Sequence, residues 1–302
     1  MERKVFKVED IEMPIRIDKY LSSKLKDYSR EYIKALCYKN LVKLNDRYVQ
    51  PDHKVKKNDI IEIFLPERKD YIIGEIKDLQ IIYEDEDILV INKPPFLKVH
   101  PAKTFDSEIT LVDILSQKIP QAQDWPLNRA YLVHRLDKET SGVLIVAKTP
   151  QAQYFLANQF KKREVKKTYH AIVFGEMKQS EGKIIAPIRK DRNISKVDGV
   201  GKEAITVFKC LSKNNGFSYL EIYPLTGRTH QIRTHLSFIG YPIIGDVIYK
   251  GINKIGTIKI PRVMLHAYSI EFIHPRRKLW QKHIADYPED FKFFLSYLSL
   301  EI

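Results

Sequence analysis

The sequence has 302 residues, 44% of them hydrophobic, which suits a globular protein with one large domain or a large and a small one. Its 51 Lys and Arg residues outnumber its 38 Asp and Glu residues, and the net charge of +13 favours a polyanionic partner, most often a nucleic acid. No apolar run is long enough to span a bilayer, and residues 1–6 lack the apolar stretch of a secretory signal. We therefore expect a cytoplasmic protein in which Cys37 and Cys210 are reduced; a basic protein without an acidic partner is the alternative.

The first predicted unit spans residues 14–65 and consists of two helices followed by short strands. Apolar residues recur at helical spacing over 17–25 and again over 30–39. Asn45-Asp46, between two short apolar runs, predicts a hairpin, and residues 59–64 predict a further strand.

This unit resembles the alpha-L RNA-binding fold. Asn40 and Asn58 stand where many members of that fold carry glycine, and asparagine is the next best residue for a positive φ. Basic residues recur along the second helix at Arg30, Lys34 and Lys39. We expect Arg30 and Lys34 to contact RNA phosphates; a solvated helix face is the alternative.

Residues 66–78 are polar and rich in charge, and we interpret them as a linker to a second unit over 79–302. In this second unit strands alternate with turns and a few helices. The predicted helices cover 151–160, about 228–239 and a stretch from 288, and the clearest strands are 169–174, 204–210 and 219–223. Consecutive strands with helices between them indicate an α+β fold with a mixed, mainly antiparallel sheet.

Several kinds of site are not supported by the sequence. No G-x-G-x-x-G follows a strand and no phosphate-binding P-loop occurs, which argues against a nucleotide cofactor. No C-x-x-C or H-E-x-x-H occurs, so we expect no metal site. Residues 134–137 superficially resemble the catalytic loop of protein kinases, but no glycine-rich loop precedes them.

The most informative motif is His-Arg-Leu-Asp at 134–137, which places a carboxylate beside a guanidinium between two apolar runs. Taken alone, Asp137 could simply cap the loop that ends at Gly142. Further motifs accompany it at 92–95, 99–101, 167–171, 226–235, 240–246 and 264–267. Together, from about residue 80 to 275, they resemble the RluA family of RNA pseudouridine synthases.

The resemblance implies roles for individual residues. The family's catalytic aspartate falls on Asp137, its active-site tyrosine on Tyr169 and a pocket-lining apolar residue on Leu265. The arginine partner of the aspartate falls on Arg233, which also lies at the edge of the apolar stripe of its predicted helix. The sequence departs from the family pattern before His100, in the loop of the first motif.

Other residues are assigned to substrate and RNA. We place His134, Arg135 and Arg228 against the substrate nucleotide, where the resemblance implies that Arg135 fills the gap left by the extruded nucleotide or contacts its phosphate. A basic run before Tyr169 offers further phosphate contacts, with solvated charge as the alternative. The residues of this run are Lys161, Lys162, Arg163, Lys166 and Lys167.

The chemistry of the family suits these residue types. Isomerising uridine breaks the bond from the ribose to the ring nitrogen and rejoins the sugar to carbon 5 of the same base. One ionised carboxylate can serve, by attacking the sugar, adding to the base or assisting proton removal from the ribose. The uridine must be flipped out of a folded RNA to reach Asp137, and Tyr169 offers a flat face for it.

We therefore predict an RNA pseudouridine synthase that acts as a monomer without cofactor or metal. The small N-terminal unit is the usual accessory domain of the branch that modifies large-subunit ribosomal RNA, which we take as the substrate. The same chemistry on transfer RNA is one alternative. A non-catalytic RNA-binding or ribosome-assembly factor that has kept the fold is another.

Overall fold

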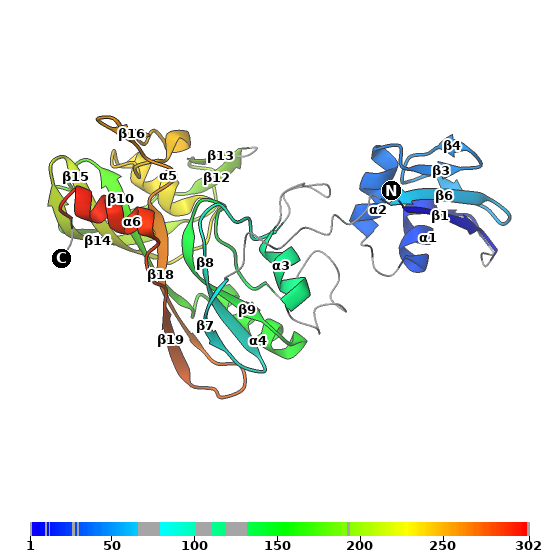
Figure 1. Ribbon diagram of the computed structural model, residues 1–302, viewed down its shortest axis with the longest axis horizontal. Helices are drawn as coiled ribbons and strands as arrows, with labels where there is room; N and C mark the ends of the chain where they lie inside the picture. Colours follow the sequence, from blue (N-terminus) through cyan, green and yellow to red (C-terminus); the bar gives the residue numbers. More distant parts are fainter. Residues whose placement is uncertain are drawn as a thin grey trace. The chain divides into compact units, whose positions relative to one another are not determined.

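The computed structural model divides the chain into two units (Figure 1). One comprises Met1–Lys77 with His100–Ala130, and the other comprises Asp78–Val99 with Tyr131–Ile302. The structure describes residues 2–9, 11, 13–25, 28, 30–65, 79–100, 110–118, 132–191 and 194–300. The predicted linker 66–78 lies outside these residues, and the predicted domain boundaries stay a prediction.

The described part of the first unit combines three helices with a small antiparallel sheet, and two of these helices precede most of the strands, as predicted. Its elements are β1 (Glu2–Lys7), β2 (Ile15–Arg16), α1 (Ile17–Lys24), α2 (Arg30–Tyr38), β3 (Val42–Leu44), β4 (Arg47–Tyr48), β5 (Lys54–Val55), β6 (Ile60–Leu65) and, later in the chain, α3 (Leu111–Lys118). The sheet order is β1-β6-β3-β4, and β2 pairs with β5. Strand β1, which precedes residue 14, was not expected, because four of its six residues are charged and the apolar signal is weak.

Four turn residues of the first unit adopt positive φ angles. Asn40 and Asn58 have φ of 56° and 71°, which confirms that asparagine supports these turns in place of glycine. Asn45 and Asp46 have φ of 47° and 65° and join β3 to β4, which confirms the predicted hairpin.

A buried aspartate joins α1 and α2 of the first unit. Asp18 is completely buried and pairs with Arg16 at 3.1 Å and with Arg30 at 3.0 Å. Burial alone would raise the pKa of Asp18, but hydrogen bonds from these arginines outweigh it and keep the pKa below its ordinary value. Arg30, the predicted RNA contact, thus also neutralises an acid of the core, with its own side chain 44% exposed.

The second unit is built on a nine-stranded sheet. Its strands are β7 (Gln80–Glu84), β8 (Ile88–Lys93), β9 (Ser141–Ala147), β10 (Lys166–Phe174), β11 (Glu181–Ile185), β14 (Ile205–Asn214), β15 (Phe217–Pro224), β18 (Leu265–Ile273) and β19 (Trp280–Ile284). They run in the order β11-β14-β15-β10-β18-β9-β8-β7, with β19 also paired to β18. Among the described pairs only β18 with β9 is parallel, which confirms the predicted mixed, mainly antiparallel sheet.

Helices and small hairpins cover this sheet. They are β12 (Ile188–Asp191), β13 (Ile194–Val197), β16 (Lys254–Ile255), β17 (Ile258–Lys259), the short 3-10 helix η2 (Val247–Tyr249), α4 (Pro150–Lys162), α5 (Gln231–Phe238) and α6 (Glu289–Tyr297). In Figure 1, α5 and both hairpins lie at one end of the unit, and α4 packs beside β9. No helix within the described ranges is long and apolar enough to cross a membrane.

Helix α5 begins at Gln231, three residues later than the predicted start near Arg228. The buried side chain of Gln231 explains the delay. Its Oε1 accepts hydrogen bonds from the Thr226 hydroxyl, at 2.7 Å, and from the Arg228 N–H, at 3.1 Å. These bonds hold residues 226–230 as a loop that folds back on the start of the helix, so periodicity alone placed the start too early.

Gly142 allows β9 to lie directly against β18. Its φ is 114°, and a Cβ atom at this position would lie 2.2 Å from the carbonyl oxygen of Ala267. Only glycine fits this close parallel contact. The contact fixes where β9 begins, and thereby positions the loop at 134–140 that precedes it.

Candidate active site

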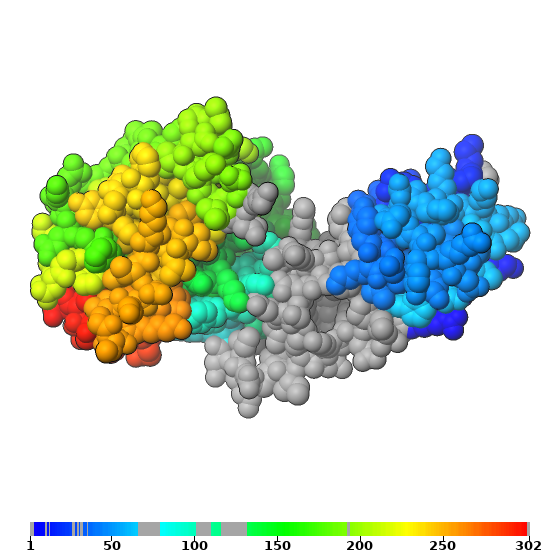
Figure 2. Space-filling model, turned by 90° about the horizontal axis from the view of Figure 1, so that it is seen from above, coloured from blue at the N-terminus to red at the C-terminus, as the bar shows by residue number. Residues whose placement is uncertain are grey.

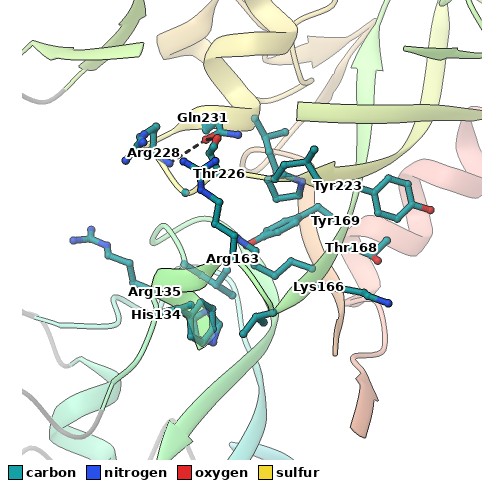
Figure 3. Close-up of a pocket in the computed structure, with 18 of the residues that line it drawn as sticks. His134, Arg135, Arg163, Lys166, Thr168, Tyr169, Tyr223, Thr226, Arg228 and Gln231 are labelled. Carbon is teal, nitrogen blue, oxygen red and sulfur yellow. Dashed lines mark hydrogen bonds between the residues drawn. The ribbon is translucent and has the colours of Figure 1, made fainter. Parts of the chain in front are cut away.

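A cavity of about 1110 Å³ opens in the second unit between α4, β10, β15 and the loop before α5 (Figure 3). Its lining includes all the residues predicted for catalysis and for substrate binding, namely His134, Arg135, Asp137, Tyr169, Arg228, Arg233 and Leu265. Residues from four separate parts of the chain therefore meet in one place. Arg30 and Lys34 belong to the first unit, and their assignment to RNA stays a prediction.

Asp137 lies in the extended loop before β9, with its side chain 24% exposed. Nη1 of Arg233 lies 3.3 Å from its Oδ2, and Nε2 of His230 lies 3.7 Å from the same oxygen. Across the described residues no donor side chain lies within hydrogen-bonding distance of Oδ1. Within the described residues, side chains of the protein thus hold one oxygen of the carboxylate and leave the other without a donor, and Asp137 lines the cavity.

Arg233 comes from α5 and is nearly completely buried. Its Nε and Nη2 bind Asp246 at 2.6 and 2.8 Å, so the contact with Asp137 is its third. Burial alone would lower the pKa of Arg233, but the hydrogen bonds and charge of Asp246, together with Asp137, raise it above its ordinary value. The guanidinium is therefore a permanent positive charge beside Asp137.

Tyr169 projects into the cavity from β10 (Figure 3). The pairing of β10 with β18 shifts register between Thr168 and Tyr169, and both side chains line the cavity. Such a bulge re-aims a side chain that regular alternation would turn away. Burial, and then the charge of Asp137, raise the pKa of Tyr169, so its hydroxyl stays neutral.

His134 anchors the loop that carries Asp137. Its Nε2 accepts a hydrogen bond of 2.9 Å from the N–H of Ile145 in β9, and its ring stacks on Phe160 of α4 at 4.8 Å. Burial, and then the charge of Lys167, lower the pKa of His134 to about 3. The neutral imidazole of His134 therefore positions the loop by accepting a backbone hydrogen bond. The predicted contact of His134 with the nucleotide stays a prediction.

Lys93 holds the other side of the same loop. Its fully buried ammonium donates to the carbonyl oxygens of Pro94, Leu97 and Lys138, at 2.7, 3.0 and 3.3 Å. Burial, and then the charge of Arg262, lower the pKa of Lys93 to about 7. A neutral amine would have two N–H groups for three acceptors, so the geometry favours the charged form.

The predicted basic run lies along the rim of the cavity. Lys161, Arg163, Lys166 and Lys167 line it, whereas Lys162 does not. Arg163 pairs with Glu203 at 3.0 Å, and Lys166 lies 3.9 Å from Glu271. Lys161 is exposed and forms no ion pair in the described part of the chain, which leaves its charge available to a phosphate.

Elsewhere in the second unit, three side chains with metal-ligand spacing are already engaged in contacts with other protein groups. Asp85, Asp87 and His274 lie close enough to share an ion. However, Nε2 of His274 donates to Asp85 at 2.8 Å, while its Nδ1 accepts two backbone N–H bonds. Asp87 pairs with Arg276 at 2.6 Å. The cluster therefore joins two turns rather than offering free ligand atoms.

Sequence reasoning did not assign three residues of the site, His230, Asp246 and Lys93. Each lies inside a motif that was recognised, at 226–235, 240–246 or 92–95. Their presence in these motifs was the sequence signal that could have identified them as site residues. Their roles depend on contacts between distant segments, which residue type and spacing do not specify.

Comparison with known proteins agrees with this geometry. A family model described as RNA pseudouridylate synthase matches residues 87–238, and one described as S4 domain matches residues 15–61. An uncharacterised RNA pseudouridine synthase of Bacillus subtilis is 37% identical over 279 residues, covering 91% of each chain. The ribosomal large subunit pseudouridine synthase D of Buchnera aphidicola (subsp. Acyrthosiphon pisum) is 36% identical, covering 93% of each chain.

Solved structures show the same similarity for most of the chain. The human protein named RNA pseudouridylate synthase domain containing 4 superposes with a TM-score of 0.61 at 27% identity, covering 74% of this chain and 94% of that one. The human protein named RNA pseudouridylate synthase domain containing 1 superposes with a TM-score of 0.56 at 26% identity, covering 76% of this chain and 97% of that one.

Proposed function

The chain belongs to the family of RNA pseudouridine synthases, and from this premise we propose that it modifies specific uridines of large-subunit ribosomal RNA, with Asp137 as its catalytic residue. The family membership confirms the predicted family and the predicted activity as an RNA pseudouridine synthase. Relatives named ribosomal large subunit pseudouridine synthase support the choice of RNA. The net charge of +13 and the S4 domain match are consistent with it.

The single observation that carries the proposal is the asymmetric setting of Asp137. Its Oδ2 lies 3.3 Å from Arg233, no described side chain donates a hydrogen bond to Oδ1, and the residue lines the cavity. The other acid that lines the cavity, Glu271, lies within 4 Å of both Lys166 and Lys282. Hydrolysis of glycosidic bonds usually requires two cooperating carboxylates, whereas an isomerisation that retains the freed base needs one.

The proposed reaction conserves all atoms of the nucleotide. The bond from the ribose carbon to ring nitrogen 1 breaks, the ribose joins ring carbon 5, and the proton leaves carbon 5 while nitrogen 1 gains one. Arg233 holds Asp137 by Oδ2, and Oδ1 then attacks the sugar, adds to the base or assists proton removal from the ribose. The cavity walls retain the base until it rejoins the sugar.

Other residues of the cavity would bind the flipped nucleotide. Tyr169 offers its ring for stacking on uracil, and its neutral hydroxyl can share a proton with the base. Leu265, which is buried in β18, forms an apolar wall. Arg135 and Arg228 are assigned to the phosphate and sugar of the nucleotide. We further expect a cytoplasmic monomer that works without cofactor or metal.

Tritium release tests the proposal directly. The full chain is incubated with large-subunit ribosomal RNA, or with transfer RNA, that carries tritium at carbon 5 of its uridines. We expect release from ribosomal RNA by the wild type and none by Asp137→Asn, which keeps its fold and RNA binding because Arg233 stays paired with Asp246. As a matched control, Asp191→Asn removes an exposed acid of β12 and should release tritium normally.

Three outcomes would contradict parts of the proposal. Full release by Asp137→Asn would remove Asp137 from catalysis. Release from transfer RNA alone would move the substrate to that class. Tight binding of both RNAs by the wild type, without release from either, would favour a non-catalytic RNA-binding factor.

A further inference from the structure

His230 lies between the candidate catalytic aspartate and a buried tyrosine. Its Nε2 is 3.7 Å from Oδ2 of Asp137, and its Nδ1 is 2.9 Å from the hydroxyl oxygen of Tyr249. The backbone of His230 is held at φ 53°, in the left-handed region that residues other than glycine rarely adopt. This uncommon conformation, just before α5, directs the imidazole at Asp137.

The hydrogen bonds of Tyr249 determine which nitrogen of His230 carries the proton. The hydroxyl oxygen of Tyr249 accepts the backbone N–H of Ser195, at 2.8 Å. Among the described residues, Nδ1 of His230 is the acceptor that remains for the hydroxyl hydrogen, and leaving a buried hydroxyl hydrogen unpaired is costly. Nδ1 therefore accepts, and the neutral ring carries its hydrogen on Nε2, facing Asp137.

The surroundings of His230 favour this neutral form. Burial lowers the pKa of His230; the charges of Asp137 and Asp246 oppose the shift, and those of Arg233 and Arg135 add to it. Tyr249 also touches the other partner of the aspartate, because the guanidinium of Arg233 lies over its ring at 5.0 Å.

The segments that form this contact are distant in sequence. Ser195 comes from β13, Tyr249 from η2 and His230 from the start of α5. In Figure 2, green, yellow and orange segments of the second unit adjoin on the face in view. The position of Tyr249 is thus set by the packing of three elements and not by a flexible loop.

We propose that Tyr249 fixes His230 as the Nε2–H tautomer, and that His230 and Arg233 together hold Asp137 by Oδ2 so that Oδ1 alone is left to react. His230 and Tyr249 are positioning residues of the isomerisation, and their role rests on the proposed function of Asp137. On this proposal we expect the distance of 3.7 Å to shorten when the nucleotide binds, since catalytic hydrogen bonds are often long in a free enzyme.

Turnover by four variants tests the proposal. Tyr249→Phe removes the hydroxyl and should lower kcat about tenfold with KM unchanged, as expected for one lost hydrogen bond. His230→Ala should lower kcat by at least as much, and His230→Gln should recover part of the loss because its amide N–H can replace Nε2–H. The double variant His230→Ala, Tyr249→Phe should match His230→Ala, because the hydroxyl acts through the imidazole.

Tyr219→Phe is the matched control. It also removes a buried tyrosine hydroxyl that bonds a histidine, here His170 at 2.7 Å, but outside the lining of the cavity. Its kcat should equal that of the wild type. Additive losses in the double variant, or an equal loss in Tyr219→Phe, would overturn the positioning role.

A second measurement does not depend on turnover. Nitrogen-15 NMR of labelled histidine, with the His230 signal identified by its loss in His230→Ala, should show the Nε2–H tautomer in the wild type and a mixture in Tyr249→Phe. A wild-type His230 that carries its hydrogen on Nδ1 would overturn this inference whether or not the protein isomerises uridine. Absence of wild-type turnover would instead count against the proposed function.

Discussion

Arg233 is held more tightly by Asp246 than by Asp137. Two of its nitrogens bind Asp246, at 2.6 and 2.8 Å, and the third lies 3.3 Å from Asp137. Asp246 is almost completely buried, whereas the Asp137 side chain is 24% exposed. Asp246 therefore fixes the guanidinium in place before substrate binds. Of the two carboxylates that Arg233 contacts, Asp137 is the one that can move.

Asp246→Asn should displace Arg233 and thereby disturb the position of Asp137. Arg233 would lose its buried paired charge, and we expect a loss of about 3–5 kcal/mol in the free energy of unfolding. Activity per folded molecule should fall roughly a hundredfold, because a displaced Arg233 no longer orients Asp137. Urea denaturation and tritium release measure the two effects. Asp290→Asn, which breaks the similar pair of Asp290 with the buried Arg262, should lose stability yet keep activity; equal activity losses would contradict the argument.

Gly142→Ala should destabilise the second unit severely. The new Cβ would lie 2.2 Å from the Ala267 carbonyl oxygen, at a φ of 114°. Because backbone would have to move on both strands, we expect a loss of at least about 3 kcal/mol and poor soluble yield. Gly199→Ala, where a Cβ meets nothing within 4 Å, should change stability by less than about 1 kcal/mol. Thermal denaturation compares them, and a Gly142→Ala protein as stable as the wild type would show that the strands do not meet so closely.

Stability should fall on acidification, in part through His134. Its pKa is about 3 in the folded chain, while the unfolded chain binds this proton below about pH 6.5. Between these values the unfolded state holds more protons, so the free energy of unfolding decreases as pH falls, by at most about 1.4 kcal/mol per pH unit. Protonation would also break the bond from the Ile145 N–H.

His134→Gln isolates this contribution. Glutamine can still accept the backbone N–H of Ile145 but does not titrate. Urea denaturation at about pH 7 and about pH 5 should show a smaller loss of stability in the variant than in the wild type. The other buried histidines are present in both proteins and cancel, so identical losses would remove His134 as the cause.

Lys161 and its neighbour Lys162 offer a matched pair for RNA binding. Both are exposed on α4, but only Lys161 lines the cavity. Lys161→Ala should weaken RNA binding and reduce the slope of log affinity against log salt by about 0.7–0.9, the value for one lost phosphate contact. Lys162→Ala should leave the slope unchanged. Filter binding over a range of salt concentrations checks both, and equal slopes would place the RNA elsewhere.

The sequence predicts local features of this fold well where a few neighbouring residues decide them. Helix α4 begins after Thr149, whose hydroxyl caps it, with Pro150 in its first turn, and the predicted range of 151–160 lies inside it. Helix α5 begins later than predicted because the Gln231 side chain accepts hydrogen bonds from the preceding loop. The apolar periodicity of the helix does not reveal these bonds.

The site was predictable in part. The motif at 134–137 indicated Asp137, and the apolar stripe of the predicted helix placed Arg233 at the edge of its buried face. The partners Asp246 and Tyr249 depend on how η2 and the turn before it pack on α5, a long-range contact with no periodic signal. Local pattern thus locates reactive residues, while tertiary packing decides what holds them.

The buried Asp18 has a consequence for attempts to improve the small N-terminal unit. The Asp18 carboxylate already accepts hydrogen bonds from the Arg30 guanidinium. A phosphate bound at Arg30 would therefore share the positive charge of Arg30 with Asp18. Removing the acid would free Arg30 for RNA but leave α1 and α2 without their ionic connection. Directed evolution at this position would therefore meet a trade-off, in which variants gain affinity for RNA only as they lose thermal tolerance.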